Sequence, residues 1–150
     1  MKIENTCCII GHNRWCYNMD LDSATYMAAL DCISQGVDTF INIWSGGYDL
    51  LCAVIINYVK QEIPYIKQYK ISPAGMSNFL SYLFDGELRI DKPVHTVMDK
   101  VNWVLEHSAH ALCFVQHDFG PAEIYLQKAK EKGLKIHRVI LPEYHYPCNS

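Results

Sequence analysis

The segment with the clearest chemical potential is Ser45-Gly46-Gly47-Tyr48-Asp49, which separates an apolar, β-branched run from an apolar helical run. Glycine lets the backbone approach a ligand closely, and the N–H groups at the start of a helix attract anions. The segment therefore predicts a phosphate-binding turn at residues 45–48, although a tight turn alone would use the same glycines. The carboxylate of Asp49 could accept a hydrogen bond from a ribose hydroxyl, or it could cap the helix that it opens.

A histidine and an arginine follow the first apolar run of the chain. Gly11, His12 and Arg14 come directly after the residues CCII. The two side chains could contact a phosphate or a glycosidic oxygen, or they could be loop residues with no such role. Both interpretations stay open on the sequence alone.

A third polar segment contains Asp118, Gly120 and Glu123, and it follows the apolar run ALCFV. Glu123 could serve as an acid, a base or a ribose ligand. It could equally be a first-turn glutamate that the helix dipole favours. Asp118 and Gly120 are candidate ligand-binding residues on the same grounds.

Strand and helix patterns alternate along the chain and provide a framework for these residues. Short apolar or β-branched runs predict strands at 7–11, 39–44, 65–71, 111–115 and 135–141. Helical spacing of apolar residues predicts helices from Asp20 or Asp22 to Gly36 and at 50–59, 97–105 and 121–129. Pro121 suits the first turn of the last helix.

This alternation predicts an α/β protein with a three-layer, Rossmann-like fold and a mainly parallel sheet of about five strands. The strand at 65–71 carries three polar residues and is expected near an edge. Ligands of such sheets bind beyond the carboxyl ends of the strands. The loops at 11–17, 45–49 and 116–123 should therefore converge on the site.

The segment 72–93 departs from the alternating pattern. Prolines and glycines interrupt it, and its centre at 76–84 is apolar and aromatic. It predicts an irregular insert that either covers the core or a subunit interface, or closes over a substrate as a lid.

Composition narrows the function further. The 150 residues fit a single domain spanning 1–150, and the net charge of −3 provides no positive field for nucleic acid. The chain has no apolar run of the ~20 residues that a membrane helix requires and no signal-peptide pattern, so we expect a cytoplasmic protein. Seven cysteines without a CxxC pair favour reduced thiols, and no metal site is predicted.

Several segments, in order, resemble the YpsA-like branch of the SLOG superfamily, which also includes the DprA and "lonely guy" (LOG) proteins. The matching segments are 8–13 (CIIGHN), 36–40 (GVDTF), 47–49 (GYD), 102–104 with Ser108, 115–120 and 129–136 (AKEKGLKI). The similarity spans most of residues 7–139. It departs from the family pattern at Asn13, where an arginine is usual, and at 118–123, where one glycine of the second loop is missing and Pro121 removes an N–H donor.

The resemblance implies a Rossmann-like sheet, often dimeric, whose glycine loops face a nucleotide or a nucleotide-derived ligand such as ADP-ribose or an NAD derivative. In LOG-type relatives the same fold hydrolyses the bond between a base and ribose 5′-phosphate, with an arginine and a glutamate of a Gly-Gly-x-Gly-Thr-x-x-Glu motif. DprA-like relatives bind single-stranded DNA. The complete LOG motif is absent from this sequence.

The leading hypothesis is therefore a homodimeric or larger homo-oligomeric protein that binds a small nucleotide ligand and needs no further cofactor. It places a phosphate on the amides of residues 45–48, ribose on Asp49, and a base or second ribose near His12, Asn102 and Gly120. The first alternative is an enzyme that cleaves or transfers an N-glycosidic bond with Glu123 or Asp49. The second is a protein-interaction module that uses the insert at 76–84.

Overall fold

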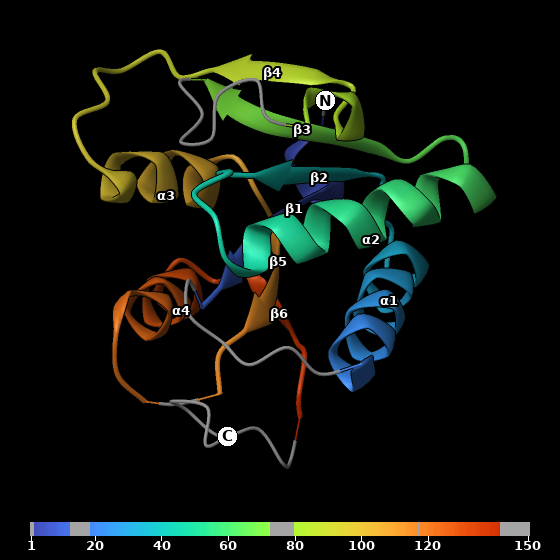
Figure 1. Ribbon diagram of the computed structural model, residues 1–150. Coiled ribbons are helices and arrows are strands. Elements are labelled where there is room, and N and C mark those ends of the chain that lie inside the picture. The colour runs from blue at the N-terminus through green and yellow to red at the C-terminus, as the bar shows by residue number, and fades with distance from the viewer. Residues whose placement is uncertain (1, 13–18, 73–79, 117, 142–150) are drawn as a thin grey trace.

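The computed structural model describes residues 2–12, 19–72, 80–116 and 118–141 (Figure 1). Six parallel strands form one sheet in the order β4-β3-β2-β1-β5-β6. The strands are β1 (Thr6–Gly11), β2 (Thr39–Asn42), β3 (Lys67–Ser72), β4 (Gly86–Arg89), β5 (His110–Phe114) and β6 (Lys135–Arg138). The helices are α1 (Met19–Ser34), α2 (Tyr48–Glu62), α3 (Val97–Glu106) and α4 (Pro121–Glu131), with short 3-10 turns η1 (Ile3–Asn5) and η2 (Ser81–Leu83).

The helices cover both faces of the sheet, with α1 and α2 on one side and α3 and α4 on the other (Figure 1). The side chains of β1 point alternately to the two faces of the sheet. Cys7 and Ile9 pack toward α1 and α2, whereas Cys8 and Ile10 pack toward α3 and α4. This arrangement confirms the predicted Rossmann-like α/β class and explains why the central strands contain hardly any polar residues.

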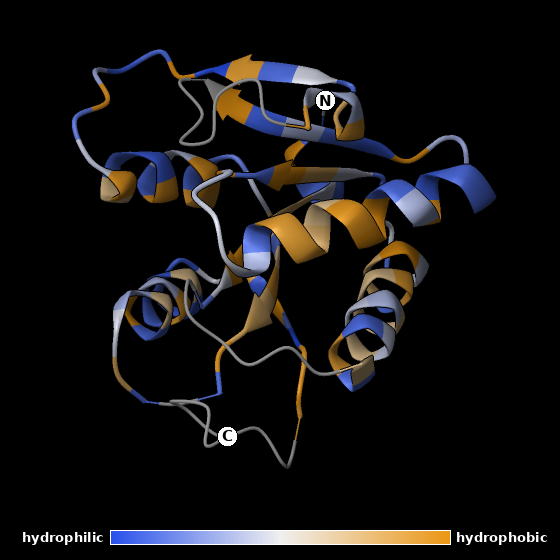
Figure 2. Ribbon diagram, in the orientation of Figure 1, coloured by the Kyte–Doolittle hydropathy of each residue, from blue (hydrophilic) through white to orange (hydrophobic). Residues whose placement is uncertain are grey.

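The prediction of about five strands was wrong by one, because β4 lies inside the segment expected to be irregular. Its four residues alternate between half-buried and exposed, and Leu88 packs against the core. Two charged residues in so short a run concealed the strand. In Figure 2, both β4 and β3 carry hydrophilic colour over part of their length, which suits the edge of a sheet.

Strand β3 therefore lies one place in from the edge, and its polar residues have partners there. Gln68 donates to the backbone oxygens of Ala53 and Leu83, both at 3.1 Å. Lys70 pairs with Glu87 of β4 at 3.3 Å. These contacts tie the described end of the insert to the sheet, where Leu83 and Phe84 pack with Trp44. Residues 73–79, which include positions 76–79 of the predicted apolar centre, lie outside the described residues.

Five cysteines are buried as free thiols on both sides of the sheet: Cys7, Cys8, Cys32, Cys52 and Cys113. The closest approach among them that the structure gives is 4.0 Å between the sulfurs of Cys7 and Cys32. A disulfide requires about 2.05 Å, so these two residues are reduced neighbours in the core. Among the described helices, none is long and apolar enough to cross a membrane.

Candidate functional site

A cavity of about 300 Å³ opens at the carboxyl ends of the central strands. The strand order reverses between β1 and β5, so the loops that follow these strands diverge there and leave space between α2, α3 and α4. The cavity is lined by Ile9, Ile10, Gly11, His12, Ile43, Ser45, Asp49, Val97, Val101, Val104, Phe119, Gly120, Pro121, Ala122 and Tyr125. The described parts of the three loops predicted to converge thus contribute to one cavity.

The turn that leads from β2 into α2 is held together from within. The backbone N–H of Ser45 donates to Oδ2 of Asp49 at 3.0 Å, and the Ser45 hydroxyl donates to the same oxygen at 2.8 Å. Asn42 donates through Nδ2 to the backbone oxygen of Asp49 at 2.8 Å and accepts the N–H of Trp44 at 2.7 Å. The carboxylate of Asp49 therefore closes the turn that precedes its helix and does not cap the helix itself.

Backbone conformation in this turn is unusual at three of the four positions before the helix. Trp44 has a φ of 57°, a region that non-glycine residues rarely occupy, and Gly46 and Gly47 have φ values of 108° and 60°. The two glycines are therefore required by the turn whether or not a ligand binds. Strain of the kind seen at Trp44 concentrates at functional sites, because the surrounding structure must hold it in place.

The hydrogen bonds do not support the predicted phosphate turn at residues 45–48. The N–H of Ser45 is bound by Asp49, and the N–H of Tyr48 donates to the backbone oxygen of His12 at 3.0 Å. Two of the four amides expected to hold a phosphate therefore have partners within the chain. Tyr48 is fully buried, and its hydroxyl lies 2.8 Å from Oγ1 of Thr25, so its side chain belongs to the core.

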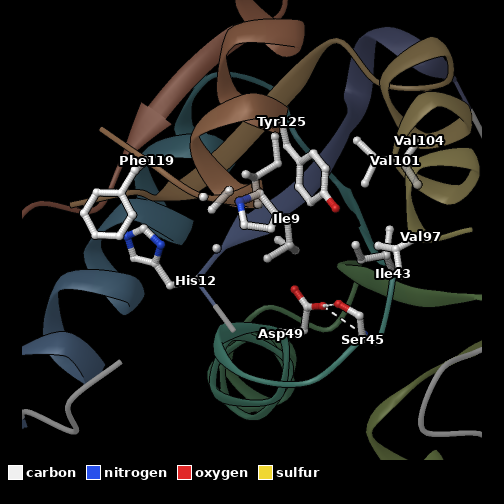
Figure 3. Close-up of a pocket in the computed structure, with 15 residues that line it drawn as sticks. Ile9, His12, Ile43, Ser45, Asp49, Val97, Val101, Val104, Phe119 and Tyr125 are labelled. Atoms are coloured by element: carbon white, nitrogen blue, oxygen red, sulfur yellow. Dashed lines mark hydrogen bonds between the residues drawn. The ribbon is translucent and has the colours of Figure 1, made fainter. Parts of the chain in front are cut away.

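Asp49 is 3% exposed and lies at one end of the cavity (Figure 3). Burial raises the pKa of its carboxyl to about 6, although the hydrogen bonds from Ser45 and the charge of Lys100 favour the ionised form. Burial lowers the pKa of Lys100, which lies on α3, and the charge of Asp49 opposes that shift. Burial and the charge of Asp49 raise the pKa of the Tyr125 hydroxyl, so this group keeps its proton.

His12, the residue after β1, lies at the opposite end of the cavity (Figure 3). Its Nε2 accepts the N–H of Gln116 at 2.8 Å, and its ring meets the ring of Phe114 edge-on with centroids 5.3 Å apart. A nitrogen that accepts an N–H carries no proton, so the imidazole is neutral in this arrangement. His12 thus has a clear structural role in joining β1 to β5, and it also lines the cavity.

The structure brings some of the predicted site residues together and separates others. Gly11, His12, Ser45, Asp49 and Gly120 line the cavity. Gly46, Gly47 and Tyr48 shape the turn beside it without lining it. Arg14 lies outside the described residues.

Asn102, Asp118 and Glu123 face elsewhere. Asn102 lines a separate hollow between α3 and the segment at 90–93. Asp118 and Glu123 line a third, open hollow beside β6, where Glu123 accepts a hydrogen bond from Gln127 at 2.7 Å. The carboxylate pair considered for an enzyme is therefore split, because only Asp49 reaches the cavity.

Much of the cavity wall consists of residues that had not been predicted as site residues. Val97, Val101 and Val104 on α3 form one side, and Tyr125 on α4 faces Asp49 across the space (Figure 3). The spacing of the valines predicted a helix, and the same spacing could have marked them as a common wall. Lys100, between Val97 and Val101, is a buried cation close enough to influence Asp49, which the sequence alone did not indicate.

The described residues contain no cluster of three or more histidine, cysteine, aspartate or glutamate side chains that could hold a metal ion. Comparison with other proteins does not assign the chain to a group. No protein-family model matches it, and no curated protein matches it significantly.

Proposed function

We propose that this protein binds a nucleotide or a nucleotide-derived ligand in the cavity at the carboxyl ends of β1, β2 and β5. The observation that carries the proposal is the buried carboxylate of Asp49 at one end of an otherwise largely apolar cavity. An aromatic and aliphatic pocket with a few polar groups is typical of small-molecule sites, and a carboxylate at this edge of a Rossmann-like sheet suits ribose hydroxyls.

The size of the cavity favours a small ligand within this class. Its volume of about 300 Å³ lies at the lower limit of the ~300–1,000 Å³ that ligand pockets span. A single nucleoside unit fits that space better than a whole dinucleotide. An NAD-like or ADP-ribose-like ligand would place only one of its halves inside.

A second candidate function is cleavage or transfer of an N-glycosidic bond, and one observation favours it. The pKa of Asp49 near 6 lets its carboxyl hold or release a proton close to neutral pH, as a general acid or base must. Of the two carboxylates predicted for such an enzyme, only Asp49 lines the cavity, since Glu123 lies in a different hollow.

A thermal-shift screen with AMP, ADP, ADP-ribose, NAD and the other nucleoside 5′-monophosphates tests the proposal. A ligand that binds only the folded protein stabilises it by ~2.7 kcal/mol at a concentration of 100 times Kd. We expect stabilisation by at least one compound, and we expect Val101→Trp, which fills the cavity, to abolish it. Glu123→Gln is the matched control, because Glu123 lies outside the cavity.

Mass spectrometry of the same mixtures separates the two candidate functions. An unchanged ligand supports binding alone, and a released base supports the glycosidase. If no compound stabilises the folded wild-type protein, nucleotide binding is wrong. Membership of the SLOG superfamily and a homo-oligomeric state are further parts of the proposal. Sedimentation velocity tests the oligomeric state.

A further inference from the structure

The cavity has an unusual charge balance for a nucleotide site. Among the described residues that line it, Asp49 is the only carboxyl, and none is a lysine or an arginine. His12 contributes no positive charge in the observed arrangement, because its Nε2 accepts the N–H of Gln116. Lys100 is not one of the lining residues and forms no ion pair with Asp49.

The carboxylate of Asp49 already lies in the turn before α2, where a bound phosphate would be expected. Oδ2 of Asp49 receives both the N–H and the hydroxyl of Ser45. A phosphate at this turn would have to displace the carboxylate from its two donors or lie against it with like charge. Neither arrangement favours a phosphate inside the cavity.

The second carboxylate oxygen of Asp49 has a different environment. Within the described residues Oδ1 accepts no hydrogen bond, and Figure 3 shows one oxygen of Asp49 directed at Ser45 and the other toward the cavity. An ionised carboxylate is only an acceptor, so Oδ1 requires a donor from whatever fills the space. The hydroxyl of Tyr125 faces the same space and keeps its proton.

We infer that the cavity takes the uncharged nucleoside part of its ligand, with a ribose hydroxyl or an amino group on Oδ1 of Asp49, and that any phosphate stays outside. This inference rests on the proposed function and narrows it. In this inference the carboxylate of Asp49 favours uncharged ligand groups and repels phosphate, whereas a phosphate-binding turn would attract phosphate.

The groups packed around Asp49 make this selection dependent on pH. They are Ser45 in the turn, Cys52 on α2, Lys100 on α3 and Tyr125 on α4. Because burial raises the pKa of Asp49 to about 6, acidification protonates the acceptor before the protein loses its other carboxylates. Nucleoside affinity should therefore fall as the pH drops below 6.

Isothermal titration of the full chain with adenosine, guanosine, cytidine and uridine, each beside its 5′-monophosphate, tests the inference at pH 7.5. We expect one nucleoside to bind at least as tightly as its monophosphate. We expect Asp49→Asn to weaken nucleoside binding by about tenfold or more, because the charged acceptor becomes a neutral amide. The monophosphate should lose no more affinity than the nucleoside. Glu123→Gln should bind like the wild type.

The outcomes separate this inference from the proposed function. If a monophosphate binds and its nucleoside does not, the inference is overturned and nucleotide binding stands. If no nucleoside or nucleotide binds to the folded wild-type protein, both fail. Should Asp49→Asn not fold, titration of the wild type at pH 7.5 and pH 5 decides: a fall in nucleoside affinity supports the inference, and an unchanged affinity overturns it.

Discussion

Gly11 and Tyr48 are packed so closely that a side chain on Gly11 would overlap the Tyr48 side chain. A Cβ built on Gly11 would collide with Cβ, Cγ and Cδ2 of Tyr48. Packing alone therefore requires a glycine at the end of β1, because the start of α2 lies directly against the strand there. A ligand is not needed to explain it.

This contact predicts that Gly11→Ala destabilises the protein by ~1–3 kcal/mol, the usual cost of overpacking a core. Urea unfolding followed by circular dichroism measures the change. Gly86→Ala is the matched control, since its Cβ would lie 3.7 Å from the ring of Tyr69, an ordinary contact. Equal stabilities of the two variants would contradict the proposed packing role of Gly11.

The buried hydroxyls of Tyr48 and Thr25 lie 2.8 Å apart and form a second testable contact. Tyr48→Phe removes one partner and leaves the Thr25 hydroxyl buried without it, so we expect a loss of ~1–2 kcal/mol in the free energy of unfolding. Thr25→Val in the Tyr48→Phe background should cost little more, because both polar groups are then gone. A double-mutant cycle by urea unfolding measures this coupling, and fully additive losses would show that the hydrogen bond contributes nothing.

Asp49 should make the protein less stable as the pH rises. Its pKa is about 6 in the folded protein and near 3.8 in the unfolded chain, so its contribution is fully present below pH 4 and is lost as the pH passes 6. The shift corresponds to about 3 kcal/mol. We therefore expect the stability of Asp49→Asn relative to the wild type to increase from pH 4.5 to pH 7.5, by up to that amount.

Urea unfolding at several pH values measures this difference, with Asp118→Asn as a control at an exposed carboxylate. A relative stability of Asp49→Asn that stays constant across the range would mean that the carboxyl ionises normally. The stability that the protein loses above pH 6 is the cost of holding the ionised carboxylate of Asp49 in a buried position.

His110 and His137 predict a pH effect of the opposite direction. Nδ1 of His110 lies 3.0 Å from Nε2 of His137, and Nδ1 of His137 lies 2.9 Å from Oδ2 of Asp31. Burial, then the charge of His137, lowers the pKa of His110 from its ordinary value of 6.5. The unfolded chain therefore binds this proton more readily, and stability should fall as the pH drops below 6.5.

His110→Gln should make the stability curve flatter between pH 7 and pH 5, as thermal unfolding across that range would show. His107→Gln is a suitable control because His107 lies outside the cluster and contacts the backbone oxygen of Trp103. A curve for His110→Gln that parallels the wild type would assign the acid sensitivity to other groups.

The sequence predicted the alternation of strands and helices and the convergence of three loops, because both follow from hydrophobic periodicity and the geometry of parallel sheets. It could not predict that the carboxylate of Asp49 accepts the N–H of Ser45 and closes the turn before α2. That hydrogen bond depends on the positive φ values at Trp44, Gly46 and Gly47. The sequence of this turn is equally compatible with a phosphate site and with a turn closed by its own side chain.

Helical phase accounts for the site residues that the structure places elsewhere. On α4, Ala122 and Tyr125 are three positions apart and line the cavity, whereas Glu123 and Gln127 are four apart and line the outer hollow. On α3, Asn102 follows Val101 by one position and is rotated away from the cavity by about 100°. Which face of its helix a residue occupies therefore decides whether it lines the cavity, and the loop to which it is adjacent does not.

The five buried thiols can report when the helices separate from the sheet. Burial raises the pKa of Cys7, Cys8, Cys52 and Cys113, so few thiolates form, and Cys32 is equally inaccessible to solvent. A thiol reagent can label these residues only after the sheet parts from its helices. Mass spectrometry of labelled peptides would therefore time the separation of each layer, and a ligand in the cavity would slow the labelling of Cys52 beside Asp49.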